Sequence, residues 1–219
     1  MLIQIADVLS PDELDEIRAT LAAAPFEDGR ATAGWSARLV KDNEQVREDS
    51  ATLRLLRERI AAAIRRNPVF EAAVRPKALT PLLVSRYGVG RSYGSHVDNP
   101  LMGELRTDVS FTLFLAEPEQ YEGGELVIES PAGEEAYKLP AGHLVAYPTT
   151  ALHRVDPVTA GERLVAVGWA QSWIRDAARR EILFDLEAAK RDLFEREGKS
   201  AAFDLLAKSA ANLVRMWAE

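Results

Sequence analysis

The chain contains only three histidines, His96, His143 and His153, and all of them lie in the β-rich middle of the chain. His96 and Asp98 are two positions apart, so on a β-strand an imidazole and a carboxylate would point to the same face. A second imidazole from a distant strand, such as that of His153, would complete a two-histidine, one-carboxylate triad of the kind that binds Fe(II). The triplet alone also fits a surface histidine beside a turn aspartate, so its neighbours decide the interpretation.

Arg163 follows His153 by ten positions and opens an apolar segment. A guanidinium binds a carboxylate through two parallel hydrogen bonds, so an arginine here suits a dicarboxylate co-substrate beside a metal. The chain has no cysteine, which excludes disulfides, cysteine-ligated metals and thiol nucleophiles. His143 follows a Pro-Ala-Gly turn and is expected to be a solvated turn residue.

The surrounding residues extend this pattern into a longer motif. It reads Tyr87-x-x-Gly90-x-x-Tyr93-x-x-His96-x-Asp98, followed by Ser110-x-Thr112-Leu113-Phe114-Leu115. This arrangement resembles the prolyl 4-hydroxylase-like superfamily of Fe(II)/2-oxoglutarate dioxygenases. The continuation is similar to one bacterial branch, the PKHD-type hydroxylases associated with iron uptake. The residues that carry this second resemblance are Gly123-Gly124-Glu125-Leu126, Pro140-Ala141-Gly142, Tyr147-Pro148, Leu152-His153, Pro157-Val158-Thr159, Arg163 and Trp169-x-Gln171-Ser172.

The resemblance implies an α+β fold whose core is a double-stranded β-helix, or jelly roll, with iron between its sheets. It implies that His96, Asp98 and His153 hold the metal and that Arg163 pairs with the distal carboxylate of 2-oxoglutarate. Tyr87 is expected to donate its phenol to that carboxylate, and no further catalytic residue is assigned. The cofactors implied are Fe(II), 2-oxoglutarate and O₂, and the family also implies L-ascorbate as a reductant.

The elements that must position these residues follow from local patterns. The sequence predicts a strand over 2–8 and a helix from Pro11, with Ser10 and Glu13 forming a capping box. It predicts a longer helix over 42–66 that Asn67-Pro68 ends. From residue 78 onward, strands are predicted at 80–87, 108–115, 124–129, 135–139, 142–147, 151–155 and 163–171, a spacing typical of an antiparallel sandwich or barrel.

The chain therefore divides into an expected dioxygenase domain over 1–175 and a C-terminal helical hairpin over 176–219. Within the first, helices are expected over 1–77 and the jelly-roll core over 78–175. The hairpin carries an apolar stripe, which we expect to pack first against the β core and which is also a candidate homodimer seam. The stripe consists of Phe203, Leu206, Ala210, Leu213 and Trp217.

Composition narrows the class of function. The formal net charge is −7, so a non-specific nucleic-acid binder is not expected, and no apolar run is long enough to span a bilayer. The first residues lack the features of a signal peptide, so a cytoplasmic enzyme is expected.

The substrate, a small molecule or a peptide, cannot be read from these residues. Asn99 and Arg106, near the His-x-Asp segment, are candidates to touch it. A non-catalytic protein that responds to iron or 2-oxoglutarate on the same fold is the alternative, and a cupin-type enzyme lacks its usual His-x-His here.

Overall fold

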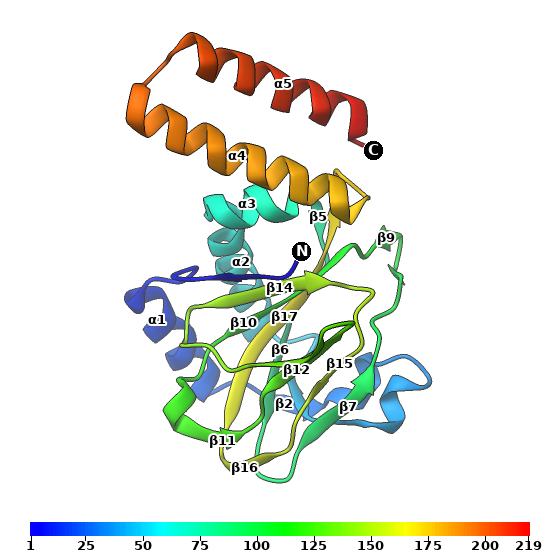
Figure 1. Ribbon diagram of the computed structural model, residues 1–219. Coiled ribbons are helices and arrows are strands. Elements are labelled where there is room, and N and C mark those ends of the chain that lie inside the picture. The colour runs from blue at the N-terminus through cyan, green and yellow to red at the C-terminus, as the bar shows by residue number, and fades with distance from the viewer.

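The computed structural model describes all residues, 1–219, and its core consists of two antiparallel β-sheets (Figure 1). The larger sheet has the strand order β1-β14-β10-β17-β6-β4-β2, with β5 paired to β17, and the smaller has the order β13-β12-β15-β7-β3. The larger sheet comprises β1 (Ile3–Ile5), β2 (Phe26–Asp28), β4 (Glu44–Val46), β5 (Pro76–Leu79), β6 (Leu83–Tyr87), β10 (Val109–Phe114), β14 (Leu144–Pro148) and β17 (Arg163–Ser172). The smaller comprises β3 (Lys41–Asp42), β7 (Ser92–His96), β12 (Leu126–Ser130), β13 (Gly133–Tyr137) and β15 (His153–Val155). Two short ribbons, β8 (Leu101–Met102) with β9 (Leu105–Arg106) and β11 (Tyr121–Gly123) with β16 (Val158–Gly161), complete the β structure.

The two sheets bury different apolar clusters. Side chains of β6, β10, β12, β14, β15 and β17 meet between the sheets, where Phe114, Val145 and Val165 are fully buried. The other side of the larger sheet packs against three helices, and Phe70 meets Phe111 there in an edge-to-face contact with ring centroids 5.4 Å apart. This two-sheet arrangement confirms the predicted jelly-roll core.

The N-terminal helices are α1 (Pro11–Ala22), α2 (Ala51–Arg66) and α3 (Pro68–Val74), joined in part by the 3₁₀ turns Gly29–Thr32 and Ala37–Leu39. The predicted cap of α1 is confirmed, because Ser10 accepts a hydrogen bond from the amide of Glu13 and the Glu13 carboxylate accepts one from the amide of Ser10. The helix predicted over 42–66 is wrong for its first nine residues, which form part of β3, β4 and a turn. Val46 is a buried residue of β4. It precedes Leu53 by seven residues, a spacing that also occurs between residues on one face of a helix, and this led to the wrong prediction.

Asn67-Pro68 ends α2 as predicted but also starts α3, which the sequence interpretation missed. The Asn67 side chain accepts hydrogen bonds from the amides of Val69 and Phe70, both at 3.0 Å, and Pro68 occupies the first helical position. One Asn-Pro pair therefore serves as both a stop and a start signal.

The C-terminal hairpin consists of α4 (Ala177–Glu197) and α5 (Ala201–Trp217), capped by Asp176 and Ser200 and joined by a turn at Gly198, whose φ is +66°. It lies at one end of the molecule, with α4 against α3 and α5 outermost (Figure 1). The expectation that α5 packs against the β core is wrong, because α5 packs on α4. Only Ala210 of its apolar stripe is fully buried, and the rest are half-buried. None of the helices combines the length with the apolar composition that a membrane span requires.

Candidate metal centre and its pocket

His96 and His153 lie at the ends of two neighbouring strands of the smaller sheet. β7 ends at His96, β15 begins at His153, and the two residues are direct partners in the antiparallel register of these strands. Their ring centroids are 4.3 Å apart, with the ring planes inclined by 50°. Sheet pairing therefore brings together two imidazoles that are 57 positions apart in the chain.

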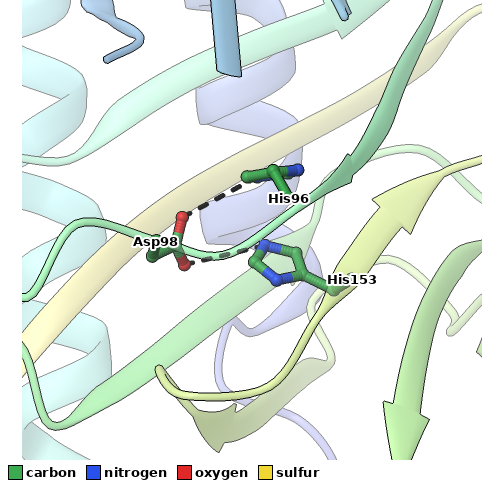
Figure 2. A group of neighbouring side chains, drawn as sticks. All are labelled: His96, Asp98 and His153. Carbon is green, nitrogen blue, oxygen red and sulfur yellow. Dashed lines mark ion pairs between the residues drawn. The ribbon is translucent and has the colours of Figure 1, made fainter. Parts of the chain in front are cut away.

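Asp98 completes the group from just beyond the end of β7 rather than from within the strand. Its Oδ1 lies 3.8 Å from Nε2 of His96, and its Oδ2 lies 3.6 Å from Nε2 of His153 (Figure 2). One nitrogen from each histidine and one carboxylate oxygen all lie within 4.8 Å of one another, so these three groups could hold a metal ion. The side chain of Asp98 is 9% exposed, so water reaches this carboxylate only through the pocket that it faces.

Hydrogen bonds fix the orientation of each of these side chains. Nδ1 of His96 lies 2.8 Å from the carbonyl oxygen of Gly94, and Nδ1 of His153 lies 3.1 Å from that of Ala151. A carbonyl only accepts hydrogen bonds, so each Nδ1 carries the proton and each Nε2 keeps its lone pair for the centre.

The carboxylate is oriented in a similar way. The hydroxyl of Ser110 donates to Oδ2 of Asp98 at 2.8 Å and lies 3.1 Å from Oγ1 of Thr149. Ser110 belongs to β10 of the larger sheet, so this contact ties the metal centre to the opposite wall of the jelly roll.

The electrostatic environment keeps His96 available as a ligand. Burial, with a further contribution from the neighbouring His153, lowers the pKa of His96 from 6.5 to about 4. Its imidazole is therefore neutral at pH 7, the form that binds metals. Tyr93 stacks on His96 with centroids 3.7 Å apart, and Tyr147 meets His153 edge-on at 5.1 Å.

Arg163 and Tyr87 occupy the larger sheet, where β17 and β6 pair them directly. Arg163 is 1% exposed, and its guanidinium carbon lies 5.0 Å from the ring centroid of Tyr87 and 5.6 Å from that of Phe114. Its Nε and Nη1 have no hydrogen-bond partner. A buried cation with unused donors is costly unless an anion pairs with it, so these atoms fit a ligand carboxylate.

Gly124 makes room for this arginine. A Cβ at position 124 would lie 3.1 Å from Cδ of Arg163 and 2.9 Å from Cγ2 of Val158, and the φ of Gly124 is +68°. Both the close approach and the backbone conformation favour glycine here.

One pocket of about 760 Å³, counting the space at its mouth, joins the histidine–aspartate group to Arg163 and Tyr87. Asn99 lines it, as expected for a candidate substrate contact. Arg106 does not, because its guanidinium donates to the carboxylate of Asp108 at 2.8 and 3.1 Å.

The pocket also contains residues that sequence reasoning missed, among them the buried Lys41 and the more exposed Thr32, both from the N-terminal segment. No local pattern marks them, since their place depends on β3 pairing with β7. His143 lies outside the pocket, where its Nε2 is 3.5 Å from the Asp7 carboxylate.

Known proteins share both the sequence and the fold. Residues 82–171 match the family model of the 2OG-Fe(II) oxygenase superfamily. Over the full length of both chains, the protein is 56% identical to a PKHD-type hydroxylase of Picosynechococcus and 52% identical to one of Acaryochloris marina.

Solved structures with the same fold include a prolyl-4-hydroxylase of Pseudomonas putida and a 2OG-Fe(II) oxygenase family oxidoreductase of Burkholderia pseudomallei. The first has a TM-score of 0.52 and 21% identity and covers 78% of this chain and 92% of its own. The second has a TM-score of 0.56 and 18% identity and covers 77% of this chain and 82% of its own. The chain therefore belongs to the PKHD-type hydroxylases of the 2OG-Fe(II) oxygenase superfamily, enzymes that use Fe(II), 2-oxoglutarate and O₂.

Proposed function

We propose that Nε2 of His96, Nε2 of His153 and the carboxylate of Asp98 hold Fe(II) for the hydroxylation of an organic substrate. The observation that carries this assignment is the convergence of the three groups, with both Nδ1 atoms already hydrogen-bonded to backbone carbonyls. Two imidazoles and one carboxylate would hold the metal and would leave coordination positions open for other ligands.

In the overall reaction O₂ is the oxidant, and bound Fe(II) would supply the redox chemistry that couples the oxidation of 2-oxoglutarate to that of the substrate. One oxygen atom enters succinate as CO₂ leaves, and the other is inserted into a substrate C–H bond to give an alcohol. The atoms and electrons balance, because the two-electron oxidation of 2-oxoglutarate accompanies the two-electron oxidation of the substrate. The protein's side chains bind and orient the co-substrate and the substrate, and they keep water away from the reacting atoms.

Arg163 binds the distal carboxylate of 2-oxoglutarate in this proposal. The support is its burial together with two guanidinium nitrogens that lack partners. Tyr87 lies beside it as its cross-strand partner, and burial raises the pKa of the Tyr87 phenol, so the hydroxyl keeps its proton for donation. Both residues act on the co-substrate and leave the metal to the triad.

The proposals for the substrate, the location, the reductant and the oligomeric state rest on the sequence and on the exposed surface of the protein. The primary substrate is a small molecule or a peptide, the location is cytoplasmic, and L-ascorbate keeps the iron reduced. A homodimer contact through the C-terminal helices is supported by the exposure of two apolar residues on α5, Leu205 at 60% and Met216 at 73%.

The test of this function is the Fe(II)-dependent conversion of 2-oxoglutarate into succinate by the purified protein, followed by mass spectrometry. We expect slow conversion without a primary substrate, abolished in His96→Ala and preserved in His143→Ala, the matched control outside the pocket. A protein that binds 2-oxoglutarate with Fe(II) but forms no succinate would favour the alternative, a non-catalytic binding protein. Conversion by His96→Ala at the wild-type rate would contradict the metal assignment.

A further inference from the structure

The N-terminal segment places a buried lysine in the wall of the pocket. Lys41 lies on β3, the edge strand of the smaller sheet, and is only 5% exposed. Lysine is rarely buried to this degree without a partner for its charge. Neither the metal triad nor the proposed site for 2-oxoglutarate uses this residue.

The contacts of Lys41 leave most of its hydrogen-bonding capacity unused. Nζ donates to Oγ1 of Thr32 at 2.9 Å and lies 5.2 Å from the ring centroid of Tyr93, but it forms no ion pair. The Thr32 hydroxyl in turn lies 2.8 Å from Oε1 of Gln45, whose amide donates to Ser85 at 3.3 Å. An ammonium has three N–H donors, so two remain without a protein acceptor.

The same wall has a further unused polar atom. Asn43 follows two residues after Lys41, lines the pocket and is 1% exposed, and its side-chain oxygen has no hydrogen-bond partner. That oxygen lies against the backbone of Gly29 and can only accept a hydrogen bond, so it does not contribute to an anion site. Buried polar groups are almost always paired, so the two unused N–H donors of Lys41 indicate a place for a ligand that accepts hydrogen bonds.

Lys41 and Arg163 occupy different parts of the pocket. Arg163 comes from β17 of the larger sheet and lies against Tyr87 and Phe114. Lys41 comes from β3 of the smaller sheet and lies over Tyr93, the ring that stacks on His96. The pocket therefore holds two separate cationic positions, one on each sheet.

We propose that Lys41, held in place by its hydrogen bond to Thr32, forms a second anion subsite, which binds a carboxylate group of the primary substrate. This inference rests on the proposed function, in which the distal carboxylate of 2-oxoglutarate occupies Arg163, its other carboxylate would lie at the metal beside the keto group, and O₂ carries no charge. An anion at Lys41 must then belong to the molecule that is hydroxylated. A carboxylate accepts several hydrogen bonds and neutralises the ammonium, which stays largely protonated at pH 7. The substrate class is therefore an organic molecule with a free carboxylate.

The experiment uses a panel of N-acetyl amino acids and their primary amides as probes. Binding to the full-length protein is measured by saturation-transfer NMR, with Zn(II) replacing iron and with saturating 2-oxoglutarate so that the Arg163 position is filled. We expect wild type to bind several acids at least tenfold more tightly than the matching amides. We expect Lys41→Met to lose this preference while its affinity for 2-oxoglutarate stays unchanged.

Lys138→Met is the matched control. Nζ of Lys138 also donates to a single oxygen, that of Tyr121 at 2.7 Å, and lies 4.3 Å over a tyrosine ring, but this residue is outside the pocket. We expect it to keep the preference for acids. Thr32→Val, which keeps the lysine and removes its hydroxyl partner, should reduce the preference in part and covers the case in which Lys41→Met does not fold.

Each other outcome overturns the proposal. It fails if no acid binds at millimolar concentration, if acids and amides bind equally, or if Thr32→Val and a folded Lys41→Met both retain the wild-type preference. It also fails if Lys41→Met weakens 2-oxoglutarate binding instead, since Lys41 would then serve the co-substrate. Failure of the proposed function looks different, because wild type would then form no succinate from 2-oxoglutarate with Fe(II).

Discussion

His96 and His153 are direct cross-strand partners in the pairing of β7 with β15, and this single register position creates the metal centre. Side chains alternate between the two faces of a strand, so a slip of one residue would turn either imidazole to the opposite face. The register shifts immediately afterwards, between His153 and Val155. The pairing of β7 with β15 is therefore regular at His153 and becomes irregular only after it.

The first prediction concerns this pair. Replacing His153 with glutamine keeps a polar side chain of similar size but removes the imidazole nitrogen. We expect Co(II) affinity, followed by visible absorption, to fall by more than about a hundredfold, beyond the loss typical for a group that only orients a ligand. His143→Gln is the control and should bind Co(II) as wild type does. Equal affinity in the two variants would remove His153 from the metal site.

The second prediction concerns the hydroxyl that orients Asp98. Ser110→Ala removes the 2.8 Å hydrogen bond to Oδ2 of Asp98 but leaves all three proposed ligands in place. We expect metal affinity to fall by roughly 10–100-fold with little change in fold. Ser95→Ala serves as the control, because Ser95 lies next to His96 on β7 but is exposed and contacts Glu129. An unchanged metal affinity in Ser110→Ala would show that Asp98 needs no such support.

The third prediction separates charge from geometry at Arg163. Arg163→Lys keeps the positive charge but loses the planar fork that binds a carboxylate through two hydrogen bonds. We expect the apparent affinity for 2-oxoglutarate to fall by roughly tenfold or more, the cost of one hydrogen bond to a charged group, while metal affinity stays unchanged. Arg154→Lys, in a partly exposed ion pair with Glu134, is the control. Wild-type affinity for 2-oxoglutarate in Arg163→Lys would contradict the assignment.

The sequence was most informative where short motifs and caps determine structure. The spacing of His96, Asp98 and His153 led to three groups that the fold brings together, and the Ser10–Glu13 capping box marked the start of α1. β7 was missed, because Ser92, Gly94 and Ser95 have low strand propensity. The strand forms because β7 pairs with β15 and β3, and this pairing outweighs the low strand propensity of its residues. A local sequence pattern cannot predict such long-range pairing.

The N-terminal segment shows the same limit. Residues 41–46 form two short strands because β3 pairs with β7 and β4 pairs with β6, partners that lie about 40 to 50 positions further along the chain. The local apolar spacing favoured a helix there, and tertiary pairing overrode it. Lys41 could not be predicted as a site residue, because its position in the wall of the pocket depends on the pairing of β3 with β7.

The fourth prediction concerns the pH dependence of stability at Lys41. Burial lowers the pKa of this ammonium from 10.5 to about 8, although the charges of Asp98 and Asp28 oppose the shift. Between pH 8 and 10.5 the unfolded chain therefore binds more protons than the folded one, so the free energy of unfolding should rise with pH. Lys41→Met lacks this rise and should be more stable than wild type at pH 7, by up to about 3–4 kcal/mol.

Urea unfolding of both proteins at intervals from pH 7 to 10 measures this difference. We expect the two stabilities to converge above pH 8, as the wild-type lysine loses its proton in the folded state. Lys138→Met is the control for the loss of a lysine elsewhere. Parallel curves for wild type and Lys41→Met across the whole range would show that Lys41 carries no desolvation penalty.

The last prediction distinguishes the two helices of the C-terminal hairpin. α4 packs against α3, buries Leu183 completely, and places buried Arg180 so that it donates to the carbonyls of Ile174 and Arg175. α5 contributes only one buried residue, Ala210. Ending the chain after Arg175 should therefore give insoluble protein or a clearly lower Tm, since burial of Leu183 alone contributes about 1.5–3 kcal/mol. Ending it after Lys199 should cost less.

Thermal unfolding and 2-oxoglutarate turnover of the two truncated chains measure this difference. A soluble, active chain of residues 1–175 would show that the β core needs neither helix. Sedimentation addresses the separate question of a dimer: if the exposed Leu205 and Met216 of α5 join two copies, the full chain should sediment above 24.2 kDa and the chain ending at Lys199 should not. A single 24.2 kDa species at micromolar concentration would remove the dimer and leave the packing of α4 on α3 unaffected.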